Sequence, residues 1–332
     1  MLNNQELKKA QTFKSLKAAA ATPDSVFKFT LRGTTTAIAS VPTEIRAFKN
    51  LQYLNLSQCP IRILPDWIGE FPNLQTLVLS EMSLAALPAS LAQLQNLETL
   101  DIGFNLDLKQ GFEHIFKLPN LKNLKIDCRD FNLTADLKNL SKLEVLQLND
   151  LQNFEELAFV YDLPNLKTLE LVSGENVKLP LGISKLTHLE TFTLSVLPLY
   201  ELPEDFAALP KLKNFSYVGL YTYILINDTS MALKVNINWA QIFDTLSKIK
   251  TLQNVDLQQN SQQLYHENLG LLTQIKKLNL NDMVRNAMID PYPTSFLNLT
   301  NLKELTISDR DLEWETIKKL PTILPNLKVV VK

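Results

Sequence analysis

Apolar residues along this chain recur in a six-residue pattern, LxxLxL, whose first, fourth and sixth positions are leucine or another apolar residue. Copies of the pattern begin at Val26, Leu51, Leu74, Leu97, Leu121, Leu143, Leu166, Leu189, Leu212, Leu252, Ile275, Leu302 and Leu327, the first and last being degenerate. Six of the twelve intervals between these starts are 23 residues long, a regularity that scattered leucines would not produce. A fixed period of this length predicts a repeat protein, because one such unit cannot bury its apolar side chains alone and has to stack on its neighbours.

Each copy predicts a short parallel strand, because its apolar residues point into a shared core while the residues between them face solvent. A second pattern, an apolar residue followed by proline and, three residues later, another apolar residue, recurs between the strands. It occurs at Val41-Pro42, Leu64-Pro65, Leu87-Pro88, Leu179-Pro180 and Leu202-Pro203. Proline is tolerated in the first turn of a helix, so this pattern predicts a short helical segment in each repeat on the side opposite the strands.

The two patterns together resemble the leucine-rich-repeat family, specifically its 23-residue LPxxI class, which is found in many bacterial and intracellular eukaryotic proteins. The resemblance covers about residues 24–332. It implies an α/β solenoid, a curved horseshoe with a parallel sheet on its concave face and short helices or 3-10 turns on its convex face. The stretch from Ser15 to Gly33 also resembles the segment that leads into the first strand of bacterial members.

The domain organisation predicted on this basis is a short cap followed by one long repeat domain. We expect residues 1–25 to form an N-terminal capping helix and lead-in segment, with an apolar stripe at Leu7, Ala10, Phe13 and Leu16. Residues 26–332 should form about 12–13 repeats, closed near residues 311–332 by a C-terminal cap. This cap is predicted to be helical because Trp314, Ile317, Leu320 and Ile323 recur at helical spacing.

Two segments depart from the repeat. The interval from Leu212 to Leu252 is 40 residues, which predicts an insertion near residues 218–238 that contains Tyr221 and Tyr223. One interpretation is a degenerate half-repeat that continues the sheet. The other is a lip beside the concave face, whose tyrosines would anchor a partner. A shorter extension, Asp290 to Pro293, should interrupt the repeat that begins at Ile275.

Members of the family usually carry asparagine or cysteine three residues after the last leucine of the strand, where the side chain satisfies backbone groups of the turn. Cys59, Asn105 and Asn260 match this position. Cys59 is therefore predicted to be buried and inert. Cys128 falls in a turn, so we expect an exposed but equally unreactive thiol.

The sequence offers no catalytic, cofactor-binding or metal-binding motif, and we predict that the chain is not an enzyme. Its eight glycines are never closer than eight residues apart, which excludes a phosphate-binding loop and a dinucleotide fingerprint. The three histidines, His114, His188 and His266, lie in different repeats, and the two cysteines form no cluster.

The net charge and the lengths of the apolar runs indicate which classes of partner and which cellular locations the sequence favours. The net charge of −2 favours neither nucleic acid nor an anionic membrane, and no apolar run is long enough to span a bilayer. Lysines interrupt the N-terminal region, so no signal peptide is predicted and a cytoplasmic location is favoured. A trimmed chain would instead be compatible with a secreted or surface location.

The concave face predicted by the strand pattern is polar and acidic. Its residues are Tyr53, Asn55, Thr76, Glu81, Asp101, Phe104, Lys125, Asp127, Gln147, Asp150, Glu170, Thr191, Asn214, Asp256, Lys277, Asn279, Asp282, Glu304, Thr306 and Asp309. Such a face can simply keep a sheet in solution. For function we single out the acids of four successive repeats, together with the two aromatic residues of the face: Asp101, Asp127, Asp150, Glu170, Tyr53 and Phe104.

We therefore predict a non-enzymatic protein-interaction scaffold that binds a basic protein partner on its concave face. The first alternative is a cell-envelope protein that binds a carbohydrate or another surface ligand, which would need an aromatic platform. The second is a structural or homo-oligomeric role. The oligomeric state is not predicted.

Overall fold

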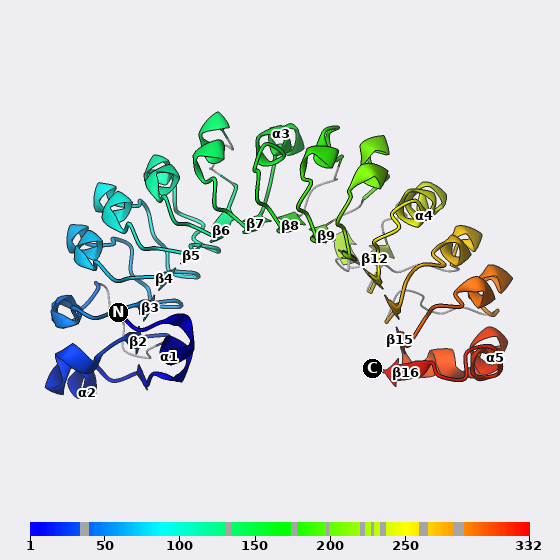
Figure 1. Cartoon of the computed structure of the whole chain (residues 1–332), viewed down its shortest axis with the longest axis horizontal. Coiled ribbons are helices and arrows are strands. Elements are labelled where there is room, and N and C mark those ends of the chain that lie inside the picture. Colours follow the sequence, from blue (N-terminus) through cyan, green and yellow to red (C-terminus); the bar gives the residue numbers. More distant parts are fainter. Residues whose placement is uncertain are drawn as a thin grey trace. The chain divides into compact units, whose positions relative to one another are not determined.

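The structure is a computed structural model, and it describes residues 1–33, 40–129, 134–173, 178–196, 199–219, 223–226, 229–232, 237–258, 265–281 and 289–332. The chain divides into two compact units. The first comprises Met1–Leu151 and Asp162–Leu166, and the second comprises Gln152–Tyr161 and Lys167–Lys332. In each unit the strands lie on one side and the helices on the other (Figure 1).

The first unit contains seven strands among its described residues. They are β1 (Thr12–Phe13), β2 (Lys28–Thr30), β3 (Tyr53–Asn55), β4 (Thr76–Val78), β5 (Thr99–Asp101), β6 (Asn123–Asp127) and β7 (Val145–Asn149). Its helices are α1 (Asn4–Lys9), α2 (Leu16–Ala21) and the 3-10 helices η1 (Pro23–Ser25), η2 (Thr43–Ala47), η3 (Asp66–Glu70), η4 (Ala89–Gln93), η5 (Phe112–Lys117) and η6 (Ala135–Asn139). Each strand pairs in parallel with the next one along the chain.

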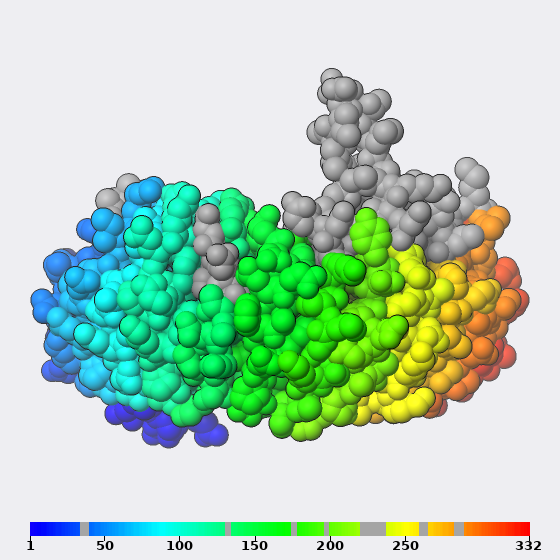
Figure 2. Space-filling view, turned by 90° about the horizontal axis from the view of Figure 1, so that it is seen from above, coloured from blue at the N-terminus to red at the C-terminus, as the bar shows by residue number. Residues whose placement is uncertain are grey.

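The second unit follows the same plan. Its strands are β8 (Thr168–Ser173), β9 (Thr191–Val196), β10 (Asn214–Gly219), β11 (Tyr223–Ile226), β12 (Thr229–Ala232), β13 (Asn254–Asp256), β14 (Lys277–Asn279), β15 (Glu304–Ile307) and β16 (Lys328–Val331). Its helices are η7 (Phe154–Glu156), α3 (Leu157–Val160), η8 (Ile183–Lys185), η9 (Glu204–Ala208), α4 (Trp239–Ser247), η10 (Glu267–Leu271), η11 (Thr294–Asn298), η12 (Asp309–Glu313) and α5 (Glu315–Ile323). All of its strands except β11 and β12 belong to the parallel sheet. Figure 2 shows the side of the chain on which the helices lie, with successive repeats following the colour bar.

The core lies between the strands and the helices, as the two apolar patterns predict. The fourth residue of each LxxLxL copy pairs with its equivalent in the next strand, so that Leu54, Leu77 and Leu100 stack in register and are fully buried. On the helix side, Ile45, Ile68 and Leu91 are fully buried in η2, η3 and η4. Burying one such side chain contributes roughly 1.5–3 kcal/mol. The predicted leucine-rich-repeat solenoid is confirmed.

Asparagine side chains tie neighbouring repeats together. In the first unit, the asparagine before the first leucine of a repeat donates its Nδ2 hydrogen to a carbonyl oxygen of the repeat before it. The pairs are Asn50 to Asp24 (2.8 Å), Asn73 to Lys49 (3.5 Å), Asn96 to Pro72 (2.7 Å), Asn120 to Gln95 (2.8 Å) and Asn165 to Ser141 (2.8 Å). The sequence pattern predicts only the asparagine of the turn, and these asparagines form a second column that the structure reveals.

Both cysteines are buried, although the sequence predicts that Cys128 is exposed. Cys59 is fully buried, and its thiol donates to the carbonyl oxygen of Leu31 at 2.8 Å, which confirms a structural role. The exposed position predicted for Cys128 is wrong, because only 4% of this residue is exposed. Its N–H donates to the carbonyl oxygen of Asn149 at 2.7 Å, so the strand-like alternation of Leu124 and Ile126 continues and turns the thiol inward.

The N-terminal segment is divided into three short elements. Two helices, α1 and α2, flank the two-residue strand β1, which pairs in parallel with β2. The predicted apolar stripe is therefore distributed over two helices and a strand, and Phe13 is its one buried member. Asn3 caps α1, with a reciprocal bond from its backbone N–H to Glu6.

The extension at Asp290 to Pro293 keeps the repeat register, contrary to the predicted interruption. Pro293 caps η11, Phe296 is fully buried three residues later, and Tyr292 takes the place of the leucine before the proline. Tyr292 stacks on Tyr265 with ring centroids 4.6 Å apart. Burial raises the pKa of both phenols well above the ordinary value.

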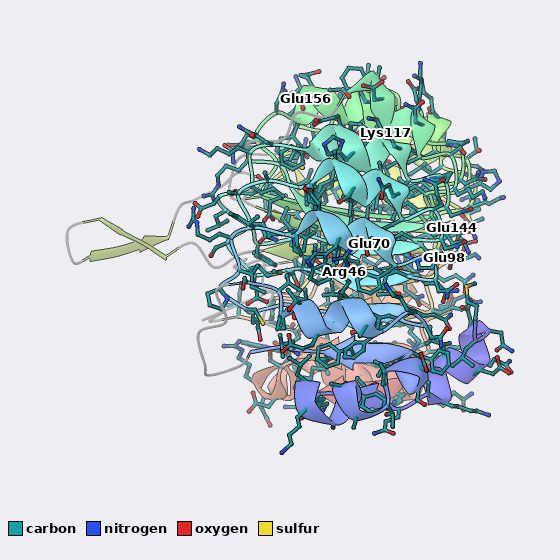
Figure 3. The ribbon with its side chains drawn as sticks, turned by 90° about the vertical axis from the view of Figure 1, so that its left-hand side faces the viewer. Arg46, Glu70, Glu98, Lys117, Glu144 and Glu156 are labelled. Atoms are coloured by element: carbon teal, nitrogen blue, oxygen red, sulfur yellow. The ribbon has the colours of Figure 1, made fainter. Side chains whose placement is uncertain are left out.

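The insertion leaves the parallel sheet uninterrupted, because β10 pairs directly with β13. Strands β11 and β12 pair with each other in an antiparallel hairpin, and among the described residues they form a separate two-stranded sheet. The hairpin stands apart from the parallel strands (Figure 3). Tyr221 lies outside the described residues, and Tyr223 is described only as the first residue of β11.

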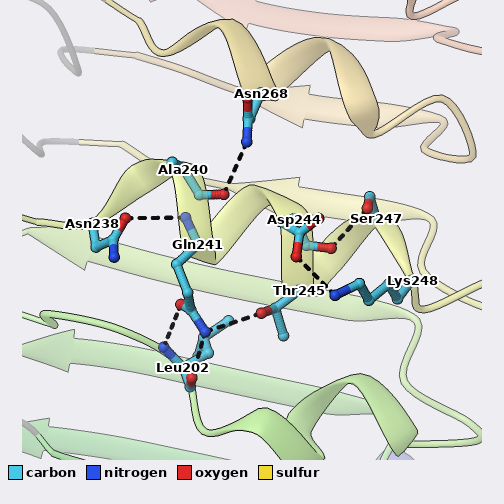
Figure 4. Close-up of polar contacts among 9 residues, drawn as sticks. All are labelled: Leu202, Asn238, Ala240, Gln241, Asp244, Thr245, Ser247, Lys248 and Asn268. Carbon is cyan, nitrogen blue, oxygen red and sulfur yellow. Dashed lines mark hydrogen bonds and ion pairs between the residues drawn. The ribbon is translucent and has the colours of Figure 1, made fainter.

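After the hairpin, the α-helix α4 takes the place of the usual 3-10 turn. The side chain of Asn238 caps α4, and Gln241 bonds both main-chain groups of Leu202, at 3.0 and 2.7 Å (Figure 4). On its other side, Asn268 donates to the carbonyl oxygen of Ala240 at 3.2 Å. These contacts hold α4 between its two neighbouring repeats.

At the C-terminal end of the chain, the predicted helical segment corresponds to α5. Ile317 and Leu320 face the core, whereas Ile323 is 42% exposed. Within the described residues, no helix is both long enough and apolar enough to cross a membrane.

Candidate functional site

The candidate site in the first unit is the strand face, which we define as the surface formed by the outward side chains of β3 to β7 and by the turn residues that follow these strands. The register places equivalent residues side by side. One row runs through Asn55, Val78, Asp101, Lys125 and Gln147. Neighbouring members of a row lie about 4.8 Å apart, so a partner can contact several repeats at once.

Phe104 is the most exposed aromatic residue of this face. It follows β5 with 49% of its surface exposed, in the left-handed backbone region at φ +58°. The equivalent turn residues Gln58, Glu81 and Asp150 share this conformation, with φ between 55° and 62°. The repeat thus imposes the left-handed turn, at a cost of roughly 1–2 kcal/mol for a residue other than glycine, and in this one repeat the turn carries a large ring.

Lys125 supports the ring of Phe104. Its Nζ lies 5.2 Å from the ring centroid, within the range of a cation–π contact. The lysine can lie there because residue 103 is glycine: a Cβ atom at Gly103 would come within 2.9 Å of the lysine Cε. Asp101 is the registered neighbour of Lys125 on the adjacent strand, so the predicted residues Asp101 and Phe104 both lie beside this lysine.

The acids that the sequence analysis grouped do not form one continuous row. Asp101 occupies the fifth position of its repeat, Asp127 the seventh and Asp150 the eighth. The carboxylate of Asp150 pairs with Arg129, whose Nε lies 2.7 Å away. Glu170, on β8, belongs to the second unit, where its registered neighbour is Thr193.

Asp127 has a structural role in the turn of the preceding repeat. Its half-buried carboxylate accepts the backbone N–H of Asn105 at 2.9 Å. Burial raises the pKa of this carboxyl above its ordinary value. The hydrogen bonds that the carboxylate accepts lower the pKa, but by less than burial raises it. The sequence pattern placed Asp127 on the face but gave no sign of its burial.

Asp127 therefore predicts a pH dependence of stability. Because the folded chain binds this proton more tightly than the unfolded chain, the free energy of unfolding should fall as pH rises through the window just above 3.8. Asp127→Asn should remove this fall, as measured by urea unfolding at a series of pH values. The exposed-residue control Asp136→Asn should retain it. If the free energy of unfolding fell equally with pH in the wild type and in Asp127→Asn, the fall would not come from Asp127.

Tyr53, the other predicted aromatic residue, is half-buried on β3. Its hydroxyl accepts the Nδ2 hydrogen of Asn55 at 3.3 Å, and the Nζ of Lys28 lies 6.0 Å from the ring centroid. Tyr53 therefore offers less free surface to a partner than Phe104 does.

The second unit has a groove of about 350 Å³ over β10, β13, β14 and β15. Six of its lining residues are among those that the strand pattern places on the face: Asn214, Asp256, Lys277, Asn279, Glu304 and Thr306. The sequence alone assigns none of these six residues to a site, because nothing in the strand pattern distinguishes them from the other residues of the face. The groove also contains Asn254, whose Nδ2 lies 2.6 Å from the Oδ1 of Asn214.

The groove is polar and carries charges of both signs. Lys277 and Lys328 approach the carboxylate of Glu304 at 3.3 and 3.5 Å, and this pairing lowers the pKa of Glu304. Phe215, the aromatic residue of the lining, is 1% exposed. The described lining thus presents no exposed aromatic ring on which a carbohydrate could stack.

Among the residues described, no three histidine, cysteine, aspartate or glutamate side chains gather as metal ligands would. The side chain of His266 accepts the backbone N–H of Asn268 at 3.1 Å and caps η10.

Comparison with known proteins agrees with this architecture. Residues 39–157 match a family model described as a leucine-rich repeat region. A leucine-rich-repeat protein of Leptospira interrogans superposes with a TM-score of 0.53 at 20% sequence identity, covering 96% of this chain and 99% of that chain. An internalin from Listeria monocytogenes superposes with a TM-score of 0.52 at 16% identity, covering 95% of this chain and 86% of that one. No curated protein matches the sequence.

Proposed function

We propose that this chain, which has the leucine-rich-repeat fold, is a non-enzymatic scaffold that binds a protein partner on the strand face of its first unit. Proteins of this architecture typically present a broad surface instead of a closed pocket. The proposal extends that property to a particular place on this chain, around Phe104.

The exposed ring of Phe104 is the observation that carries the proposal. Aromatic residues are enriched in the centres of protein interfaces, where burying one ring contributes much of the binding energy. Here the left-handed turn projects the ring from the end of β5, and Lys125 holds one side of it. A ring that is already positioned loses little conformational freedom on binding.

Asp101 supplies the charge that favours a basic partner. Its carboxylate accepts the backbone N–H of Gly103 at 3.1 Å and has no ion pair among the described residues. Asp127 and Asp150 are engaged within the chain. The basic group of the partner is therefore proposed to meet Asp101 beside Phe104.

The proposal predicts that Phe104→Gly abolishes partner binding without harming the fold. Glycine adopts the left-handed turn freely, which offsets the lost cation–π contact, so the free energy of unfolding should stay within about 1 kcal/mol of the wild type. The partner captured from lysate by the wild type should bind this variant at least tenfold more weakly in calorimetry.

Two matched variants make the result specific. Phe104→Tyr keeps a ring and should retain binding, and Phe159→Ala removes another exposed aromatic residue, on α3, and should also retain it. Capture of the same partner with unchanged affinity by Phe104→Gly would refute the proposal.

A further inference from the structure

The second position of each repeat carries a ladder of alternating charge. Six successive repeats have glutamate and lysine in turn at this position: Glu98, Lys122, Glu144, Lys167, Glu190 and Lys213. In the first unit, Glu98 and Lys122 pair at 3.0 Å, and Glu98 and Glu144 lie along the same edge (Figure 3). In the second unit, Glu190 and Lys213 pair at 2.8 Å. Within each unit, a glutamate and a lysine of neighbouring repeats thus neutralise one another.

This alternation ends at β13. The next three repeats carry Gln253, Lys276 and Lys303 at the same position. The backbone N–H of Lys303 donates to the carbonyl oxygen of Lys276 at 2.8 Å, so the two lysines are direct neighbours. Like charges at neighbouring positions of a sheet are destabilising, and the earlier repeats show that the fold accepts a glutamate here.

Two more lysines join this part of the sheet, and we call Lys276, Lys277, Lys303 and Lys328 the basic edge. All four are exposed. Lys277 and Lys328 share the single carboxylate of Glu304, Lys276 reaches the Oε1 of Gln253 at 3.2 Å, and Lys303 has no ion pair among the described residues. Among the described residues, Glu304 is thus the one carboxylate that forms ion pairs with these four lysines, and Asp256 is a second carboxylate in the adjoining groove.

The basic edge adjoins the groove, because Lys277 belongs to both and its partner Glu304 also lines the groove. Inside the groove, the Oδ1 of Asn254 has no donor among the described residues, and its Nδ2 uses one hydrogen for Asn214. Asn279 likewise uses one Nδ2 hydrogen, for Asp256 at 3.1 Å, and its Oδ1 accepts one hydrogen, from the backbone N–H of Asn281 at 3.1 Å, which leaves one lone pair. These carboxamides therefore retain both donor and acceptor capacity, which matches the N–H and C=O groups of a peptide backbone.

We propose that the basic edge and the groove bind an acidic, extended polypeptide segment, whose carboxylates contact the lysines and whose main chain contacts Asn254 and Asn279. This site is distinct from the strand face around Phe104, and the inference rests on the proposed function only in taking the ligand to be a protein. The amide groups of the groove favour a polypeptide over an anionic glycan or a lipid surface.

The test is fluorescence anisotropy of the full chain with a labelled oligo-glutamate peptide and with its oligo-glutamine counterpart. We expect the glutamate peptide alone to bind, and its binding to weaken as ionic strength rises from about 0.05 to 0.5 M, because salt screens exposed charges. The double variant K276E/K303E should lower its affinity at least tenfold. The single variant K276E should unfold at the same urea concentration as the wild type or higher, since the new carboxylate faces Lys303 and restores the alternation.

The control K318E makes the same change of charge on α5, in the helix layer, and should keep the affinity within twofold of the wild type. Phe104→Gly should also bind the glutamate peptide normally, so that failure at the strand face and failure at the basic edge give different results. Equal affinity of the wild type and K276E/K303E for the peptide would overturn the proposal. Binding of heparin or of phosphatidylserine vesicles through Lys276, with no binding of the peptide, would overturn the assignment to a polypeptide.

Discussion

Leu146→Asp should prevent the first unit from folding. Leu146 is fully buried on β7 and pairs in register with Leu124 of β6. The substitution removes burial worth about 1.5–3 kcal/mol and places an unpaired carboxylate in an apolar core. The combined loss is comparable to the roughly 5–15 kcal/mol that holds an ordinary domain together.

The measurement for this variant is soluble yield, followed by hydrogen exchange of whatever soluble protein remains. Because contacts in a solenoid are made between neighbouring repeats, we expect protection to be lost first in β6 and β7 and then in the adjoining strands. The control Gln147→Asp introduces the same carboxylate one residue later, on the outward face, and should remain folded. A normal unfolding curve for Leu146→Asp would mean that the strand register is wrong.

Asn105→Ala should produce the second large effect. Asn105 is 2% exposed and bonds five backbone groups: its Oδ1 accepts the N–H groups of Met82, Ser83 and Leu84 at 3.1–3.3 Å, and its Nδ2 donates to the carbonyl oxygens of Leu79 and Ile102 at 2.8 and 2.9 Å. Alanine leaves these groups unsatisfied in a buried turn. Since each such group costs about 1–3 kcal/mol and some will find water, we expect a loss of about 3–5 kcal/mol in the free energy of unfolding.

Urea unfolding followed by circular dichroism measures this loss. The control Asn73→Ala removes a half-buried side chain with one hydrogen bond among the described residues, 3.5 Å to the carbonyl oxygen of Lys49, and should cost under about 1 kcal/mol. A loss for Asn105→Ala as small as that of the control would show that the turn does not depend on its asparagine.

Most of the fold could be predicted from the sequence because the same LxxLxL pattern recurs in every repeat. A single leucine of β3, β4 or β5 does not by itself indicate a buried strand. The period that these leucines share assigns all of them to stacked strands of one core. Local features that occur once were harder to predict. The two-residue strand β1 has too few residues for a pattern, and Cys128 is buried because β6 extends further than the earlier strands.

The candidate site was less predictable than the fold, since position on a strand face does not reveal what a side chain contacts. Asp101 and Asp127 are both outward in the pattern. The carboxylate of Asp127 nevertheless accepts a backbone N–H from the repeat before it, whereas the carboxylate of Asp101 accepts one from Gly103 in its own turn. The groove in the second unit contains a hydrogen bond between Asn254 and Asn214, which lie 40 residues apart in the chain and are brought together by the pairing of β10 with β13.

That pairing also identifies a junction at which the chain accepts additional sequence. On one side of the insertion, the backbone N–H of Gly219 donates to Gln258 at 3.2 Å, and on the other side that of Asn238 donates to Tyr200 at 2.9 Å. Both ends of the inserted segment are therefore anchored in the same stack of repeats, and the repeat core does not depend on the length between them. An epitope or a fluorescent domain grafted between β11 and β12 should leave the repeats folded, which makes this junction the natural place to label the protein without altering either proposed binding surface.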